Sequence, residues 1–294
     1  MTFIDFARAH GVEIDPARFY SSERIHRCGT VDKPRSGNGA WFWNGERGWV
    51  MDWAGDAKVT WFEDPNAKPL TVEERKEWFE KRRKEKNRII QQYYQAGIKA
   101  KQILDGASYE NHAYLEIKGF PEEKGFVVDG KLLIPMRNAK TEQLQGYQEI
   151  YWDESQRKYV KKMMAGMMAK NAIWFMGSYS VDEVWFVEGY ATGLSLHKAL
   201  RSVGLLASVA VCFSANNLVQ VANQFIGNRY VFADNDESKT GEKAAIETGL
   251  PWTMADEVGM DANDMHDKLG LMSVVKKVMD LRKEVLTNKL EMSV

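Results

Sequence analysis

The sequence predicts an α/β protein with a parallel sheet, preceded by a small basic α+β subdomain and by a small β-rich N-terminal domain. Three observations support this prediction. From about residue 180 onwards, short apolar runs alternate with helical patterns, as in parallel strands joined by crossover helices. Residues 71–104 have the charged composition of one long helix, and residues 1–65 concentrate tryptophan and glycine.

The composition is that of a folded protein without a large excess charge. The 294 residues, 44% of them hydrophobic, suffice for one large domain or for two to three small ones. The net charge of −1 provides no global attraction to nucleic acid, so such binding requires local basic patches. Because no apolar run reaches membrane-spanning length and no secretion signal is evident, we expect a cytoplasmic protein with no membrane partner.

Residues 1–65 are predicted to form a small antiparallel sheet. Strands are expected at 40–43 and 48–53, on either side of a hairpin turn at Asn44-Gly45. Because Cys28 and Cys212 lie far apart and lack metal-ligand spacing, neither a disulfide framework nor a zinc site is expected. The tryptophans of this segment could fill a core or stack on bases; they are Trp41, Trp43, Trp49, Trp53 and Trp61.

Residues 66–105 are predicted to be a charged helical connector, and residues 106–178 a basic α+β subdomain. The cationic stretch 81–88 of the connector is compatible with a solvated face and with a nucleic-acid contact. Strands are expected at 131–136 and 145–150. The segment 125–131 has the spacing of a phosphate-binding loop, but Leu132 stands where a hydroxyl is required and a strand follows, so we interpret it as a turn.

Five basic side chains of this subdomain are candidates for contacting nucleotide or nucleic-acid phosphates. They are Arg137, Lys158, Lys161, Lys162 and Lys170. Arginine binds phosphate in a bidentate way, and clustered lysines neutralise a polynucleotide backbone. The alternative is that the lysines belong to an ordinary solvated surface.

Residues 179–270 are predicted to form the parallel-sheet domain, followed by a C-terminal helix over 271–294. The expected strands are 183–187, 206–213 and 230–233, and the expected helices are 190–200, 217–225 and 240–248. Each of these strands is apolar along most of its length, as in sheets that are covered on both faces.

Acidic residues follow the strands of this domain. Glu188 comes directly after the first strand, Asp234 and Asp236 come after the third, and Asp261 and Asp264 lie beyond it. Carboxylates at the carboxyl ends of parallel strands lie in the crevice where such sheets bind ligands. Clustered carboxylates repel one another unless a cation binds, and hard oxygen ligands suit Mg²⁺ or Mn²⁺. We therefore expect Glu188, Asp234, Asp236 and Asp264 to bind divalent metal.

Each acid also has a structural interpretation. Glu188 could cap a helix, Asp234 and Asp236 could stabilise a turn, and Asp264 could cap a helix that begins near Met265. The occurrence of three acidic strings at the ends of neighbouring elements favours the metal site.

Together these strings resemble the signature of TOPRIM domains, in the version carried by phage and plasmid DNA primases. The strings are Glu188-Gly-Tyr-Ala-Thr-Gly, Asp234-Asn-Asp236 and Asp261-Ala-Asn-Asp264. Upstream, the segments 111–119, 132–137 and 144–146 are similar to the basic subdomain that precedes TOPRIM in bacterial-type primases. The resemblance covers roughly residues 105–270 and implies a TOPRIM domain with a Rossmann-like parallel sheet over 179–270. It also implies a zinc-ribbon-like domain over 1–65 that lacks zinc ligands, since 26–29 holds one cysteine.

The resemblance implies a primase-type nucleotidyltransferase that makes short RNA primers on single-stranded DNA during phage or plasmid replication. Asp234 and Asp236 would hold the Mg²⁺ or Mn²⁺ ions, Asp264 would support a second ion, and Glu188 would bridge a metal or relay a proton. Single-stranded DNA and ribonucleoside triphosphates would be its partners, with a separate replicative helicase as a further one, in the host cytoplasm if the protein is phage-encoded. The alternatives are a TOPRIM nuclease and a catalytically weak single-stranded DNA-binding or helicase-associated module.

Overall fold

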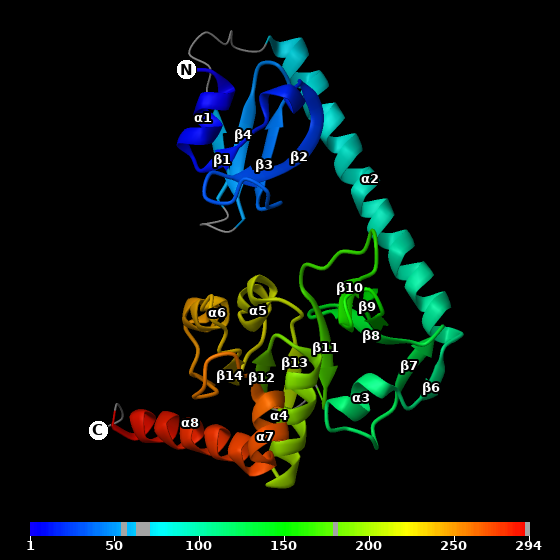
Figure 1. Cartoon of the computed structure of the whole chain (residues 1–294), viewed down its shortest axis with the longest axis vertical. Helices are drawn as coiled ribbons and strands as arrows, with labels where there is room; N and C mark the ends of the chain where they lie inside the picture. The colour runs from blue at the N-terminus through cyan, green and yellow to red at the C-terminus, as the bar shows by residue number, and fades with distance from the viewer. Residues whose placement is uncertain (54–57, 63–70, 179–181, 292–294) are drawn as a thin grey trace. The chain divides into compact units, whose positions relative to one another are not determined.

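The computed structural model describes residues 1–53, 58–62, 71–178 and 182–291. The chain forms two compact units, Met1–Arg82 and Arg83–Val294. The domain boundaries predicted at 65/66 and 178/179 fall on or beside residues outside the described ranges. Helix α2 (Val72–Asp105) confirms the long helix predicted over 71–104 (Figure 1). The division between the two units falls within this helix.

The N-terminal unit contains a five-stranded antiparallel sheet in the order β1-β2-β3-β4-β5. Its elements are α1 (Phe3–Ala9), β1 (Val12–Glu13), a short 3₁₀ helix (Pro16–Arg18), β2 (Ser22–Thr30), β3 (Gly39–Trp43), β4 (Gly48–Asp52) and β5 (Thr60–Phe62). The predicted hairpin joins β3 to β4, and the Asn44 N–H donates to the Arg47 carbonyl at 3.1 Å. Gly45 adopts φ +101°, a conformation that glycine reaches without steric cost.

The tryptophans of this unit divide between its core and its surface. Trp41 and Trp43 point into the core, where Phe3 packs against both rings. Trp53 and Trp61 remain 49% and 56% exposed. The core interpretation therefore holds for the first pair. Of the exposed pair, Trp53 contacts the Arg27 guanidinium, which lies 5.2 Å from its ring centroid.

The second unit contains a ten-stranded mixed sheet. Its path runs β10-β9-β8-β11-β13-β12-β14-β15, with β7 pairing to β8 and β6 pairing to β7. The strands are β6 (Ser108–Glu110), β7 (Gly125–Val128), β8 (Lys131–Asn138), β9 (Leu144–Asp153), β10 (Lys158–Met163), β11 (Ala172–Met176), β12 (Glu183–Val187), β13 (Ser208–Val211), β14 (Asn228–Ala233) and β15 (Trp252–Met254). The helices after α2 are α3 (Ala113–Ile117), α4 (Tyr190–Ser202), α5 (Ala215–Ala222), α6 (Thr240–Thr248), α7 (Ala262–Leu269) and α8 (Leu271–Glu291).

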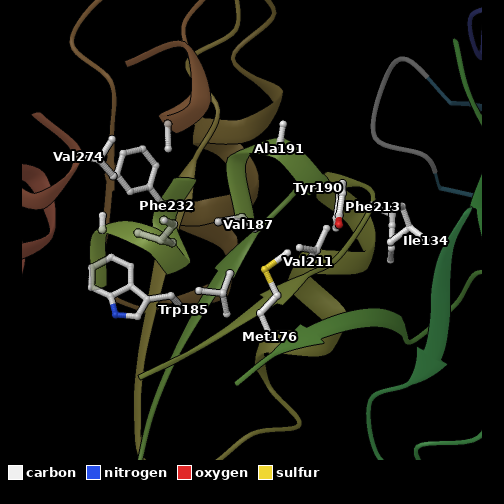
Figure 2. Packing of buried hydrophobic residues seen from close by; sticks show 14 of the residues in the cluster. Ile134, Met176, Trp185, Val187, Tyr190, Ala191, Val211, Phe213, Phe232 and Val274 are labelled. Atoms are coloured by element: carbon white, nitrogen blue, oxygen red, sulfur yellow. The ribbon is translucent and has the colours of Figure 1, made fainter. Parts of the chain in front are cut away.

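The last four strands of this path, β13-β12-β14-β15, are parallel, as the alternation of strand and helix predicts. Helices cover both faces. Trp185 and Val187 of β12 pack in the core that α4, α7 and α8 cover, while Val184 and Phe186 pack in the core that α5 and α6 cover. Figure 2 shows Trp185, Val187 and Phe232 on the first of these faces. Successive side chains of a strand point to opposite faces, so a strand buried on both is apolar throughout.

The strands β6 to β11 are antiparallel to their neighbours. The hairpin between β7 and β8 shows whether segment 125–131 is a phosphate-binding loop or a turn. Asp129 and Gly130 connect the two strands and both have positive φ, at +49° and +71°. A two-residue connection of this kind is a tight hairpin turn. The interpretation of segment 125–131 as a turn is therefore confirmed.

Two helices differ in their bounds from the predictions. The helix expected near Met265 begins at Ala262, because Asp261 keeps an extended backbone and its side chain accepts the N–H groups of Asn263 and Asp264. The helix expected over 217–225 spans Ala215–Ala222, because Ser214 caps its start. Among the helices that the structure describes, none is long and apolar enough to cross a membrane.

Candidate functional site

The topology of the parallel strands brings two of the predicted acids to the carboxyl ends of neighbouring strands, a region that we refer to as the crevice. From β12 the chain passes through α4 to β13 on one side, and then through α5 to β14 on the other side of β12. The chain order therefore reverses between β12 and β14, and ligands of open α/β sheets bind outside the carboxyl ends of the strands at such a point. Glu188 directly follows β12 and Asp234 directly follows β14.

Glu188 lies largely buried at this edge. Burial raises the pKa of its carboxyl, and the negative charge of Asp236 raises it further. The positive charge of Lys161 and a hydrogen bond from the Ala215 N–H oppose this increase. Ala215 is the first residue of α5, so the start of that helix faces the Glu188 side chain.

Asp234 has the most perturbed carboxyl of the crevice. Burial, followed by the charges of Asp261 and Glu188, raises its pKa to about 8. Its Oδ1 atom is buried and has no hydrogen-bond partner among the described residues. An unpaired buried oxygen beside further negative charges is costly, and a bound cation or a proton would relieve it.

Asp236 is engaged with the start of α6. Its carboxylate accepts hydrogen bonds from the Ser238 hydroxyl, from the Thr240 N–H at 3.2 Å and from the Gly241 N–H at 3.0 Å. Burial alone would raise the pKa of Asp236, but these hydrogen bonds hold it below its usual range. Its contacts are thus those of the turn and cap interpretation.

Asp261 and Asp264 form a capping box at the start of α7. Asp261 Oδ1 accepts the Asp264 N–H at 2.9 Å, and Asp264 Oδ2 accepts the Asp261 N–H at 3.2 Å. The other oxygen of Asp261 accepts the Thr192 hydroxyl at 2.8 Å. Since Asp261 also raises the pKa of Asp234, it is Asp261 that the structure couples to the crevice.

Two glycines allow these elements to approach one another. A Cβ atom on Gly193 of α4 would lie 2.5 Å from a Val211 methyl and 3.4 Å from a Val187 methyl. Figure 2 shows both valines below Ala191, which belongs to the first turn of this helix. A Cβ atom on Gly241 of α6 would lie 2.3 Å from the Asp234 carbonyl oxygen. The contacts at 2.5 and 2.3 Å are shorter than real Cβ contacts, so a larger residue at either position would force its neighbours to shift.

The predicted basic residues are not gathered on one face. Along β10, Tyr159 and Met163 pack against the core, so the period of two places Lys161 on their face and Lys158 and Lys162 on the other. Lys161 lowers the pKa of both Glu188 and Asp234, which places its charge near the crevice.

Lys170 and Arg137 lie elsewhere in the same unit. Lys170 is exposed, and its carbonyl accepts a hydrogen bond from the Gln145 side chain at 3.5 Å. Arg137 is exposed on β8 and donates to the Glu142 carbonyl at 3.1 Å. Neither contributes to the pKa shifts of Glu188 and Asp234.

The acids have the oxygen donors that a divalent cation prefers, but they are not arranged as a set of three or more ligands. Within the described ranges, no group of three or more His, Cys, Asp or Glu side chains is placed to hold a metal ion. The donor type does fit, because the crevice offers carboxylate oxygens, as Mg²⁺ and Mn²⁺ prefer. The unpaired Oδ1 atom of Asp234 is the specific observation in favour of a cation there.

The sequence analysis does not identify two residues of this site. One is Asp261, whose charge acts on Asp234, and the other is Thr192, which donates a hydrogen bond to Asp261. A signal was present for the first. An acid three residues before a second acid is the pattern of a capping box, and it predicts a helix that begins at Ala262. No sequence signal identifies the Thr192 contact, because Thr192 and Asp261 are 69 residues apart.

Parallel strands covered by helices on both faces, joined to antiparallel strands in one sheet, place this unit in the mixed α/β class. No protein-family model matches the chain, and no curated protein matches its sequence. Among solved structures, the catalytic core of DnaG shows a weak likeness, with 16% identity and a TM-score of 0.34. The match covers 50% of this chain and 52% of that one, so the chain spans about half of the structure that it resembles.

Proposed function

We propose that the chain is a primase-like protein of the TOPRIM type that transfers nucleotides on a single-stranded DNA template. The observation that supports it best is the placement of Glu188 and Asp234 at the carboxyl ends of adjacent parallel strands, where the chain order reverses. The TOPRIM-like acidic strings of the sequence supply these residues together with Asp236, Asp261 and Asp264.

Glu188 and Asp234 are the residues that would hold a divalent cation, because Asp234 Oδ1 has no hydrogen-bond partner among the described residues and Glu188 accepts one backbone N–H, that of Ala215. Mg²⁺ or Mn²⁺ bound there would supply charge neutralisation on the transferring phosphoryl group and activation of a hydroxyl nucleophile. Asp236 and Asp264, which we also propose as ligands, would have to exchange helix-start contacts for the ion.

The proton on Asp234 has a defined place in this proposal. Because its pKa is raised to about 8, the carboxyl is largely protonated at neutral pH without a cation and would lose that proton when one binds. Lys161, on the same side, would then lose its attraction to the acids and become free to hold a phosphate.

A single incubation tests the proposal. The protein is mixed with labelled ribonucleoside triphosphates, single-stranded DNA and Mg²⁺ or Mn²⁺, and the products are examined for extension and for template cleavage. Extension that disappears in Asp234→Ala and persists in Asp267→Ala, an exposed residue of α7, supports the proposal. Cleavage without nucleotides would replace it with a nuclease.

A binding module without catalysis is the second candidate. The contacts of Asp236 and Asp264 favour this candidate, because both carboxylates already accept hydrogen bonds at the starts of helices. Only Glu188 and Asp234, instead of four acids, then remain to bind a cation. It predicts that single-stranded DNA binds and that neither extension nor cleavage occurs. Circular dichroism of Asp234→Ala must match that of the native chain for any of these outcomes to be interpreted.

A further inference from the structure

The edge of strand β8 carries a gap in its hydrogen-bonded ladder. On one side, β8 pairs with β9 along nearly its whole length. On the other side, β7 pairs with it up to Leu133 and β11 pairs with it from Arg137 onwards. Residues 134–136 therefore have no strand on that side, and Pro135 lies at the centre of the gap.

A cavity of about 390 Å³ opens at this gap. Its walls come from the last turn of α2, from β7, β8 and β11, and from the start of β9; the lining residues include Lys101, Leu104, Phe126, Pro135, Arg137 and Trp174. Pro135 has no N–H group, so the floor of the cavity exposes no unpaired donor at that position. This volume lies in the range of small-molecule sites, roughly 300 to 1,000 Å³.

The cavity combines aromatic walls with one available cation. Phe126 and Trp174 are both half-buried, and each contributes to the lining. Lys101 is neutralised by an ion pair with Asp105 at 2.6 Å, and Asp105 also lines the cavity. Arg137 has no ion-pair partner among the described residues and uses one N–H on the Glu142 carbonyl. A guanidinium has five N–H groups, so most of its donors remain available.

Flat aromatic walls beside a free guanidinium suit a ligand with a planar ring and an anionic group. Bases stack on aromatic side chains, and guanidinium binds phosphate through two parallel hydrogen bonds. We propose that this cavity is a nucleotide-binding site, with the base against Trp174 and the phosphate on Arg137. The proposal does not depend on catalysis at the crevice, because none of the acids of the crevice lines the cavity.

The occupant is one nucleotide, either free or at a position within a nucleic-acid strand. Titration calorimetry in EDTA measures binding of AMP, adenosine and ribose 5-phosphate, followed by displacement of AMP with a short oligodeoxynucleotide. AMP should bind more tightly than either of its parts, since each part lacks one of the two contacts. Displacement by the oligonucleotide assigns the site to a strand, and failure to displace assigns it to a free nucleotide; both support the site.

Two charge-removing variants make the test specific. Arg137→Gln should weaken AMP binding about tenfold, the usual effect of losing a charged hydrogen bond. Lys140→Gln removes an exposed cation from the same β8–β9 hairpin, outside the cavity lining, and should leave binding within twofold. Because Arg137 is exposed, its replacement does not threaten folding.

Equal binding of AMP and adenosine, or equal losses in the two variants, would overturn the proposal. So would the absence of AMP binding at millimolar concentration. The EDTA keeps this result separate from the proposed function. Asp234→Ala should abolish primer synthesis yet leave AMP binding in EDTA intact, so each idea can fail without the other.

Discussion

Gly241 and Asp234 approach so closely that no side chain fits between them. A Cβ atom at position 241 would lie 2.3 Å from the Asp234 carbonyl oxygen and 3.1 Å from its backbone nitrogen. The same glycine donates its N–H to Asp236 at 3.0 Å. The first turn of α6 is thereby held against the backbone that carries both acids.

Gly241→Ala should therefore displace this turn and lower the free energy of unfolding by about 1–3 kcal/mol, the usual cost of overpacking. Urea unfolding followed by circular dichroism measures the loss. Gly106→Ala is the matched control, because a Cβ atom there meets only ordinary contacts at 3.7 Å and beyond. Equal stabilities of the two variants would contradict the close contact.

The pKa of Asp234 predicts a pH-dependent stability. In the folded chain this pKa is about 8, above the usual value of 3.8, so the fold favours the protonated form. The contribution of Asp234 to the free energy of unfolding is therefore greatest below pH ~4. Between pH ~4 and ~8 this free energy falls by at most ~1.4 kcal/mol per pH unit, and above pH ~8 it falls no further. An asparagine side chain has no such proton to lose, so Asp234→Asn should gain stability over the native chain as pH rises from 5 to 9.

Urea unfolding in EDTA at three pH values measures this difference. Asp267→Asn, at an exposed position on α7, should follow the native chain at each pH. Replacing the EDTA with Mg²⁺ at pH 9 should stabilise the native chain more than it stabilises Asp234→Asn, since a cation competes with the proton for the same oxygens. A constant difference between native and Asp234→Asn across pH would contradict the raised pKa.

Sequence patterns predicted the parallel strands and the long helix because each carries its own periodic signal. Strands β12 and β14 contain the apolar runs 184–187 and 230–233, and such short runs, rich in aromatic and β-branched residues and bounded by polar residues, favour strands. The short strand β15 (Trp252–Met254) was not predicted, since three half-buried residues carry no period. Its pairing to β14 depends on tertiary contacts that local sequence does not encode.

The acids of the site were predictable as a group but not in their individual environments. Glu188 and Asp234 follow from their positions at strand ends. The capping contacts of Asp236 depend on where α6 begins. The helix starts at Thr240, directly after Lys239, whose backbone is in the left-handed conformation. The separation of Lys161 from Lys162 depends on strand β10, which the sequence pattern does not predict.

Asp236 allows its structural role to be separated from a role in metal binding. Asp236→Ala removes the acceptor for the first N–H groups of α6 and should cost about 1 kcal/mol of stability in EDTA. Asp236→Asn keeps one acceptor oxygen and should cost less. If Asp236 also binds metal, both variants should reduce Mn²⁺-dependent stabilisation, and Asp236→Ala should reduce it at least as much as Asp236→Asn; if Asp236 only caps, both should retain it.

Lys161 and Lys162 form a natural pair of test positions because neighbouring strand residues face opposite ways. Lys161→Gln should weaken binding of a nucleoside triphosphate in Mg²⁺ about tenfold, since its charge lies near the acids. Lys162→Gln should remain within twofold of the native chain. Titration calorimetry gives both Kd values, and equal effects would mean that the face of the strand does not matter.

Strand β11 has a consequence for anyone who wishes to shorten this protein. It pairs with β8 on one edge and with β13 on the other. In the described part of the sheet, it is therefore the one strand that joins the antiparallel strands to the parallel ones. A fragment starting after residue 178 would leave the backbone groups of β13 without their neighbour along one edge. Such an edge invites pairing with other chains, so we expect that fragment to aggregate, whereas one that begins within α2 should stay monodisperse.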